Sequence, residues 1–235
     1  MENVLVDQKF GRTLEEKNFV NEQQAREINI LYGQNGDSSK KLLKRIFDLA
    51  FSFFTLVFVV SWLFPIIAIL IKLDSKGSVF FKQLRHGKDN QLFYCYKFRT
   101  MVKNDDADIK QATVNDSRIT RVGKFLRKSS LDELPQIFNV ILGDMSIVGP
   151  RPQAVPMNIE FAKEIDNFMA RHQVKPGITG LAQSKGFRGE ISSYHELHSR
   201  FRLDYFYVGK WCLIFDIKII IDTAVSLMTK SDKAY

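Results

Sequence analysis

One segment constrains this chain more than any other: the 26 residues from Ile46 to Ile71, whose only charge is Asp48, near the start. About 20 apolar residues suffice for a helix to cross the hydrocarbon core of a bilayer, and buried helices of soluble domains are usually shorter. The segment begins too late for a secretory signal peptide, and no cleavage site of that kind is evident. The pattern therefore predicts a membrane helix in preference to the alternative, a core helix of a soluble domain.

The topology of this helix is constrained by cations and by one proline. Lysine and arginine are enriched on both flanks, before the segment at Lys40, Lys41, Lys44 and Arg45, and after it at Lys72, Lys76, Lys82, Arg85 and Lys88. The positive-inside rule compares the two flanks, and here it separates them poorly. Pro65 removes a backbone hydrogen bond and favours a kink. A re-entrant helix that bends and returns to the same face accounts for both features, and a straight crossing is the alternative.

The rest of the chain indicates a small α+β fold, mostly helical with one β-hairpin. Residues Val79–Phe81 and Leu92–Tyr96 predict two strands around the turn-like Arg85–Asn90. Apolar residues recur at helical spacing from about Asn158 to His172, which predicts an amphipathic helix. The apolar run Trp211–Met228 contains three charges, so it is expected to lie at the membrane interface or to pack on the core rather than to cross.

Together these features divide the chain into three parts. Residues 1–40 form a polar N-terminal arm, with a short helix expected around 15–31, residues 41–75 form the hydrophobic anchor, and residues 76–235 form a domain that ends in an amphipathic helix. The formal net charge of +8 indicates an anionic partner, for which nucleic acid, anionic lipid and phosphorylated substrates all qualify. Composition alone does not choose among them.

Several common kinds of site are not supported by the sequence. Neither a phosphate-binding P-loop nor a dinucleotide-binding Gly-x-Gly-x-x-Gly motif is present. The two cysteines, Cys95 and Cys212, have no metal-ligand spacing and no disulfide framework around them. The four histidines do not form a clear ligand set, and the acidic stretch 105–108 is more typical of a solvated loop than of a metal site.

Asp132 and Glu133 are adjacent carboxylates in the stretch 124–136, where chemically versatile residues are densest. Such a pair suits a division of labour in which one carboxylate attacks or moves a proton while the other holds a metal. The same residues fit a capping box, in which Ser130 caps a helix and Glu133 reaches back to it. Pro135 counts against the cap, because it would stand where a helix normally needs a backbone donor. Both interpretations stay open on the residues alone.

Cations surround this pair at spacings that suit phosphate binding. Four of them recur at every third position just upstream, at Arg118, Arg121, Lys124 and Arg127. Lys97 and Arg99 would lie on one face of a strand, with a solvated edge as the alternative. Arg151 is flanked by two prolines that restrict its backbone, which fits an anion site or an ordinary rigid turn. Lys175 begins a second Pro-Gly turn that is equally ambiguous.

In this order, the motifs resemble those of a known family. The resemblance rests on 44–48 (Lys-Arg-Ile-Phe-Asp), 97–101 (Lys-Phe-Arg-Thr-Met), 116–123, 130–136, 143–152 and 175–183. The chain is similar to the bacterial sugar transferases, the monotopic phosphoglycosyl transferases, which are undecaprenyl-phosphate sugar phosphotransferases. The similarity runs from about residue 41 to 228.

The resemblance implies roles for individual residues. Asp132 corresponds to the nucleophile, and Glu133 to a residue that helps to hold Mg²⁺. Arg127 matches an active-site position, and Lys97 and Arg151 match motif cations expected to bind phosphate. Arg99 and Arg118 are added here as candidate phosphate-binding residues from their spacing. The family's anchor is re-entrant and broken by a proline, often after serine, whereas this chain has Phe64–Pro65.

The resemblance also implies an activity and a location. Such an enzyme transfers a sugar 1-phosphate from a UDP-sugar to undecaprenyl phosphate and releases UMP, through a covalent aspartyl-phosphosugar intermediate. This is the first membrane step in assembling capsule, exopolysaccharide, O-antigen or glycoprotein glycans. The expected location is the bacterial inner membrane, with the catalytic domain on the cytosolic face, membrane lipids as partners and no nucleic acid. A basic, membrane-tethered binding or scaffold protein without catalysis is the alternative.

Overall fold

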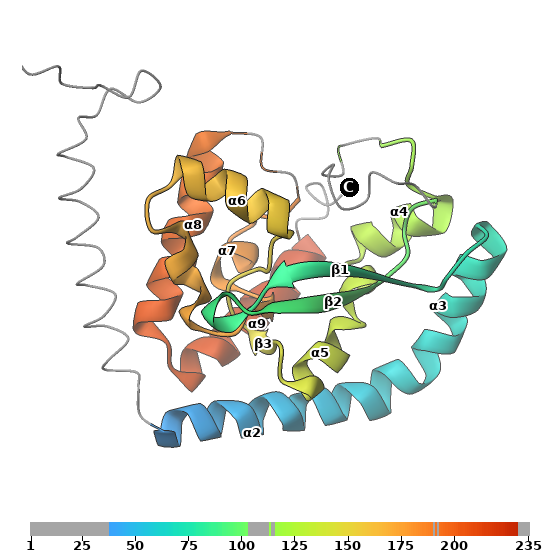
Figure 1. The fold of residues 1–235 in the computed structure, drawn as a ribbon. Coiled ribbons are helices and arrows are strands. Elements are labelled where there is room, and N and C mark those ends of the chain that lie inside the picture. Colours follow the sequence, from blue (N-terminus) through green and yellow to red (C-terminus); the bar gives the residue numbers. More distant parts are fainter. Residues whose placement is uncertain (1–37, 103–112, 114–115, 190, 192, 230–235) are drawn as a thin grey trace, which may run out of the picture.

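The computed structural model describes residues 38–102, 113, 116–189, 191 and 193–229 of the chain. The predicted arm and the acidic stretch 105–108 lie outside these residues. The described part is mostly helical and has one antiparallel hairpin, as the α+β prediction requires. Figure 1 shows the hairpin in front of a group of short helices, with one long helix along the edge of the molecule.

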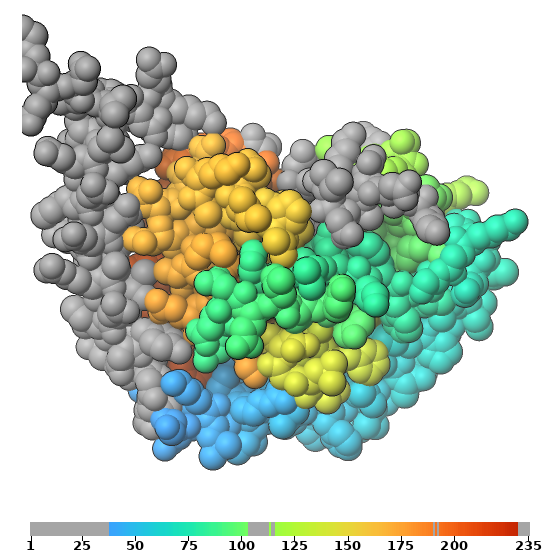
Figure 2. All heavy atoms as spheres, viewed as in Figure 1, coloured from blue at the N-terminus to red at the C-terminus, as the bar shows by residue number. Residues whose placement is uncertain are grey.

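The long helix runs from Ser38 to Asp74 and is the one described helix that is long and apolar enough to cross a membrane. It consists of α2 (Ser38–Thr55), the π-helical turn η1 (Leu56–Val60) and α3 (Ser61–Asp74). In Figures 1 and 2, α2 follows the lower edge of the molecule, and α3 turns upward beside α4. The helix continues through Pro65, and the irregular turn lies just before it, at Leu56–Val60.

Side chains supply extra hydrogen bonds around the irregular turn. Ser61 Oγ donates to the carbonyl of Val57 at 2.6 Å, and Trp62 Nε1 donates to the carbonyl of Phe58 at 2.7 Å. A widened turn weakens the regular backbone bonding, so such donors stabilise carbonyls that face an apolar medium. Phe64, before Pro65, has no hydroxyl that could donate to a freed carbonyl. Ser61 and Trp62 supply such donors nearer the π turn instead.

Both ends of the long helix contact the same set of short elements. Near its start, Arg45 donates to the carbonyls of Val140 and Ile141, at 2.6 and 2.9 Å. At its end, the Asp74 carboxylate accepts from the backbone N–H of Val122 at 2.9 Å. Helix bends at π turns are common. This bend lets the start of the helix contact α5 and its end contact α4.

The outer face of the long helix is apolar and exposed. Only 22% of its most apolar window is buried. The exposed large apolar side chains include Ile46, Phe53, Phe54, Phe58, Trp62, Ile66, Ile69 and Leu73. Exposed apolar area on this scale marks a membrane or protein interaction surface. The buried face contributes Ile67 and Ile71, which pack with Phe98 and Leu126.

The hairpin consists of β1 (Phe80–His86) and β2 (Leu92–Phe98), joined through the short helical turn η2 (Lys88–Asn90). The pairing places Phe81 opposite Lys97 and Arg85 opposite Phe93. The predicted strands are confirmed, but they are longer than expected: Arg85 and His86 belong to β1 rather than to the turn. Strand β3 (Ser146–Val148) pairs in parallel with β4 (Gly177–Thr179), and the sequence analysis missed both.

The remaining helices surround these strands. In chain order they are α4 (Arg121–Lys128), η3 (Leu131–Glu133), α5 (Gln136–Leu142), α6 (Val155–Glu164), η4 (Phe168–Gln173), α7 (Leu181–Ser184), α8 (Tyr194–Lys210) and α9 (Leu213–Thr229). The single helix predicted from Asn158 to His172 is wrong. The chain breaks between α6 and η4, where Asn167 takes a left-handed conformation with φ 55°.

The main core lies between α5, β3, α8 and α9, where Val140, Met145, Ile147 and Ile219 are almost fully buried. Helix α9 has an unusual distribution, because its buried positions include the polar Asp216 and Ser226. Apolar residues of α9 are instead exposed, at Ile214, Ile217, Ile221, Val225 and Met228. Helix α9 therefore packs on the core through one face, as one of the two alternatives predicted, while its other face is apolar and exposed, as in an interfacial helix.

Candidate active site

The Asp132–Glu133 pair lies in a short 3₁₀ turn between α4 and α5. Ser130 precedes it in a left-handed conformation with φ 56° and makes no side-chain cap, and α5 begins only at Gln136, after Pro135. The Glu133 carboxylate does not reach back to Ser130. The capping-box interpretation is therefore wrong, and the reason is Pro135, which delays the regular helix until after the pair.

Glu133 is instead held by two cations from distant parts of the chain. Its Oε1 accepts from Lys97 Nζ of β2 and from Arg151 Nη2, both at 2.6 Å, and its Oε2 accepts from Arg151 Nη1 at 2.9 Å. The arginine contact is a two-pronged pair, the geometry that orients a carboxylate most firmly. Burial acts to raise the pKa of Glu133, but Arg151 and Lys97 outweigh it and hold this pKa well below its ordinary range.

Asp132 has a different environment. The residue is only 7% exposed, and among the described residues no group donates a hydrogen bond to its carboxylate. Burial raises the pKa of Asp132 to about 6, against the opposing charge of Lys97. A buried carboxylate without donors is poorly solvated, and a poorly solvated anion is a stronger nucleophile. With this pKa the carboxyl is largely ionised near neutral pH.

Arg127 approaches the pair from the last turn of α4. Its Nε donates to Thr100 Oγ1 at 2.9 Å, and its charge acts to lower the pKa of Asp132. Helix α4 is capped by Thr120, whose Oγ1 accepts from the N–H of Gly123 at 3.0 Å. At Gly123 the backbone of α4 lies very close to that of Thr100, because a Cβ at this position would lie only 2.0 Å from the carbonyl oxygen of Thr100. The glycine thus lets α4 pack against the segment that orients Arg127.

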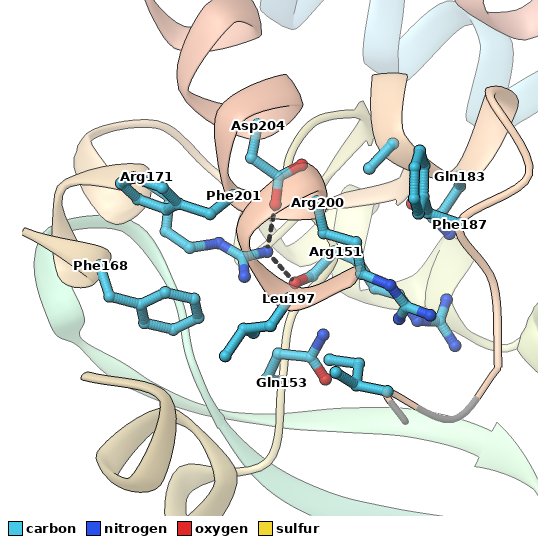
Figure 3. Close-up of a pocket in the computed structure, with 12 residues that line it drawn as sticks. Arg151, Gln153, Phe168, Arg171, Gln183, Phe187, Leu197, Arg200, Phe201 and Asp204 are labelled. Carbon is cyan, nitrogen blue, oxygen red and sulfur yellow. Dashed lines mark hydrogen bonds and ion pairs between the residues drawn. The ribbon is translucent and has the colours of Figure 1, made fainter. Parts of the chain in front are cut away.

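The backbone that follows the Arg151 side chain is held by two other arginines. Arg85 of β1 donates to the carbonyl of Pro152, and Arg171 donates to the carbonyl of Arg151 at 2.5 Å. Arg171 is also paired with the buried Asp204 at 2.8 Å, as Figure 3 shows. The same figure shows the residues that line a pocket here, among them Arg151, Arg171 and Asp204 together with Gln153 and Phe187. These contacts fix the direction from which Arg151 reaches Glu133.

Of the predicted site residues, the structure brings Lys97, Arg127, Asp132, Glu133 and Arg151 together, but not the other two. Arg99 follows β2, and its guanidinium donates to carbonyls at the end of α3, including that of Ser75 at 2.7 Å. Arg118 forms a two-pronged pair with Asp116, from Nε to Oδ1 and from Nη2 to Oδ2. That pair, led by the hydrogen bond, lowers the pKa of Asp116. Both guanidinium groups are engaged by structural partners, so the structure does not support their predicted contact with phosphate.

Two cations near the site have no counterpart in the predictions. Arg171 follows no recognisable motif, and its role depends on Asp204, which is 33 residues away in sequence. Arg188 uses its Nε to donate to the carbonyl of Gln183 at 3.1 Å. Burial lowers the pKa of Arg188, followed by the nearby charge of Arg151, while Glu133 raises it. No local pattern in the sequence signals either residue, because their partners come from other elements.

The residues present fit a magnesium ion only together with a phosphorylated ligand. Mg²⁺ in proteins is commonly bound by one or two carboxylates, substrate phosphates and water. Glu133 Oε2 accepts a single hydrogen bond, which leaves it one lone pair, and Asp132 lies next to it in the chain. Among the described residues, no group of three or more acidic, histidine or cysteine side chains forms a complete protein cage.

Comparisons with known proteins identify the family of the chain. The family model described as "Bacterial sugar transferase" matches residues 39–230. The chain is 54% identical, over 69% of its length, to UDP-glucose:undecaprenyl-phosphate glucose-1-phosphate transferase of Xanthomonas campestris pv. campestris. It is 41% identical, over 80% of its length, to the exopolysaccharide production protein PSS of Rhizobium leguminosarum bv. phaseoli, covering 96% of that protein.

A third relative is named for a different donor sugar. The chain is 42% identical, over 69% of its length, to UDP-N-acetylgalactosamine-undecaprenyl-phosphate N-acetylgalactosaminephosphotransferase of Aeromonas hydrophila. The chain spans only about a third of the length of the Xanthomonas and Aeromonas proteins, 34% and 38% respectively. The matching region is therefore one part of those longer proteins.

Proposed function

Because this chain belongs to the bacterial sugar transferase family, we propose that it transfers a sugar 1-phosphate from a UDP-sugar to undecaprenyl phosphate and releases UMP. The observation that carries the proposal is the environment of Asp132. A buried carboxylate without hydrogen-bond donors, bordered by Lys97, Arg127 and Arg151, combines a reactive anion with a pocket of positive charge for phosphate.

The proposed reaction has two substitutions at one phosphorus. An oxygen of Asp132 attacks the sugar-bearing phosphorus, and the bond from that phosphorus to the bridging oxygen breaks, so that UMP leaves with the electron pair. An oxygen of the lipid phosphate then attacks the same phosphorus, and the bond to Asp132 breaks. The carboxylate is restored and the lipid carries a diphosphate-linked sugar. Covalent catalysis suits this transfer because a soluble donor and a membrane-held acceptor can then react with the same carboxylate one after the other.

The surrounding residues support the transfer by charge and by orientation. Arg151 and Lys97 are positioned beside the pair, where they would offset the repulsion between the carboxylate and an approaching diphosphate. Arg127 would contribute to the same field from α4. Glu133, with Asp132, would hold Mg²⁺ together with the diphosphate, and the ion would supply additional positive charge to the leaving group. Glu133 also keeps the two cations from pairing with Asp132.

We further propose that the anchor is re-entrant and that the domain faces the cytosol at the inner membrane. Arg45 at the start of the long helix and Asp74 at its end both bind the same group of short elements. A straight crossing would separate these ends by about 30 Å of hydrocarbon. The exposed apolar face of α9 would lie in the same interface. A soluble donor and a membrane-held acceptor would thereby reach the pair from opposite sides.

The test is UMP release from a panel of UDP-sugars, with and without undecaprenyl phosphate. UDP-glucose and UDP-N-acetylgalactosamine come first, because relatives named for both sugars match this chain. We expect one donor to give UMP in amounts stoichiometric with enzyme when the lipid is absent, and continued turnover when it is present. Removal of Mg²⁺ by a chelator should stop both. Salt-sensitive binding of anionic polymers without any UMP release would instead support a non-catalytic protein.

A further inference from the structure

Lys175 and Arg45 bring two positive charges together beside Gly143, at the C-terminal end of α5. A Cβ placed on Gly143 would lie 3.6 Å from Lys175 Nζ and 3.8 Å from Arg45 Nη2, so both cations approach a single point. Like charges that approach the same point repel each other. Burial lowers the pKa of Lys175, and the charge of Arg45 lowers it further.

No described residue neutralises Lys175 by direct contact. Arg45 donates to two carbonyls, of Val140 and Ile141, which are neutral and leave its full charge in place. Lys175 Nζ makes no hydrogen bond and no ion pair of 4 Å or less with the part of the chain that the structure describes. Two carboxylates act on it from farther away, Asp48 and Asp144, while the cation Lys88 opposes them.

Both of these carboxylates have other partners. The Asp48 carboxylate accepts from Lys44, from the Ser146 hydroxyl and from the N–H of Ile147. The Asp144 carboxylate accepts from the amide of Asn139 at 3.3 Å. The two converging cations therefore favour an anion from outside the chain.

The surroundings of this point are apolar and exposed. Leu142, the last residue of α5, is 68% exposed, and Leu42, Ile46 and Leu49 recur along one side of α2 with large exposed fractions. Cations beside an exposed apolar face are positioned at the level of phosphate headgroups when that face enters a bilayer. A soluble anion would not need the apolar border, whereas an acyl chain would cover it.

We propose that Lys175 and Arg45 bind the phosphate of an anionic membrane lipid beside Gly143. The site is separate from the catalytic pair, because the seven residues of α5 lie between them, about 10 Å at 1.5 Å per residue. The bound lipid would hold the N-terminal half of the long helix at a fixed depth. The site requires a membrane but does not depend on the proposed reaction.

Trp211 offers a way to observe this lipid. Its indole N–H donates to Asp216, whose carboxylate also binds Lys44, the neighbour of Arg45 in sequence. The other tryptophan, Trp62, is replaced by phenylalanine (W62F) in every sample. The full chain is placed in phosphatidylcholine vesicles that contain a fixed fraction of either brominated phosphatidylglycerol or brominated phosphatidylcholine, and the quenching of Trp211 fluorescence is measured.

Brominated phosphatidylglycerol is expected to quench Trp211 about twice as strongly as brominated phosphatidylcholine at equal fraction, if one anionic lipid occupies the site. Lys175→Gln should remove most of this excess, and Lys175→Arg should keep it. The matched control is Lys163→Gln, which removes an exposed lysine of α6 paired with Glu160 and should change nothing.

Equal quenching by the two lipids would overturn the proposal, as would an excess that survives Lys175→Gln. An excess that falls equally with Lys163→Gln would show attraction by the overall charge, which also overturns a specific site. Displacement by inorganic phosphate at low millimolar concentration would reassign the site to a soluble anion. None of these outcomes depends on UMP release, so the proposed function can fail or hold independently.

Discussion

Two clusters of buried carboxylates and cations show how similar residues serve different ends. The first, which we call the catalytic cluster after its proposed role, is the Asp132–Glu133 pair with its cations. The second, which we call the anchor cluster, consists of Lys44, Asp48, Asp216, Tyr207 and Trp211. In the anchor cluster every acid is saturated: Lys44 Nζ bridges both carboxylates, at 3.0 and 2.8 Å, and the Tyr207 hydroxyl and Trp211 indole donate to Asp216. In the catalytic cluster Glu133 is saturated with hydrogen-bond donors in this way, and Asp132 is not.

The difference lies in where the donors go. Burial raises the pKa of Asp216, but Lys44, Trp211 and Tyr207 act against that effect by direct hydrogen bonds. At the catalytic pair, Glu133 receives the hydrogen bonds of Lys97 and Arg151, while Asp132 receives none from the described residues. A saturated carboxylate stabilises the fold, and an unsaturated one retains its reactivity at a cost in stability.

The same replacement in the two clusters should separate activity from stability. Asp132→Asn removes the attacking oxygen, and we expect turnover to fall by at least about 10⁴-fold, together with loss of any phosphosugar adduct. UMP release and intact-protein mass spectrometry measure the two effects. Normal turnover in this variant would refute the assignment of Asp132 as nucleophile.

Asp216→Asn in the anchor cluster should act on stability instead. It leaves Lys44 facing one carboxylate rather than two, and the buried donors of Tyr207 and Trp211 face a weaker acceptor. We expect a loss of roughly 3 kcal/mol, or about 6–12 °C in Tm. Thermal unfolding in detergent measures it, and turnover per folded molecule should stay within about twofold. A large fall in turnover without a change in Tm would contradict the division between the clusters.

Glu133→Gln tests whether the saturated acid of the catalytic cluster is needed as a charge. The amide keeps the shape but no longer balances Lys97 and Arg151, so both cations become free to pair with Asp132. Turnover should fall by roughly 100-fold, and the pH at which activity is half-maximal should move downward because the Asp132 pKa falls. An unchanged pH profile would show that Glu133 does not control its neighbour.

The smallest expected effect is on the stability of the Asp132 variant. The pKa of this carboxyl is raised to about 6 in the folded protein, above the ordinary value of about 3.9 for an unfolded chain. Between these values the folded state binds more protons, so stability falls as pH rises from about 4 to 6 and stays lower above that. Asp132→Asn should therefore stabilise the protein by roughly 2 kcal/mol at pH 7 but not at pH 4. Equal stabilisation at both pH values would contradict the raised pKa.

Sequence reasoning succeeded where local pattern determines structure. The apolar run, the hairpin and the order of motifs depend on residues close together in the chain. The capping box failed because Pro135 displaced the helix start, a local conflict that the pattern of Ser130 and Glu133 alone did not resolve. Arg99 is predicted on one strand face with Lys97, but β2 ends at Phe98 and Arg99 binds the end of α3, because the competing carbonyls come from a distant segment.

The residues that position Arg151 could not have been found in this way. Arg85 and Arg171 act on its backbone from β1 and from η4, and Asp204 supports Arg171 from α8. Each contact spans a long stretch of sequence and carries no motif of its own. Spacing identifies which side chains could meet a phosphate, whereas the fold decides which of them are already engaged elsewhere.

The contact between Asp48 and the N–H of Ile147 has a consequence for how the protein is made. The acceptor and the donor are separated by 99 positions, and the acceptor lies inside the most apolar part of the chain. A ribosome adding roughly 5–20 residues per second synthesises the partner several seconds after Asp48 has emerged. During that interval Lys44, one turn away, is the nearest partner available to the carboxylate. The early Lys44–Asp48 pair would thus allow the helix to enter the membrane before its final partners exist.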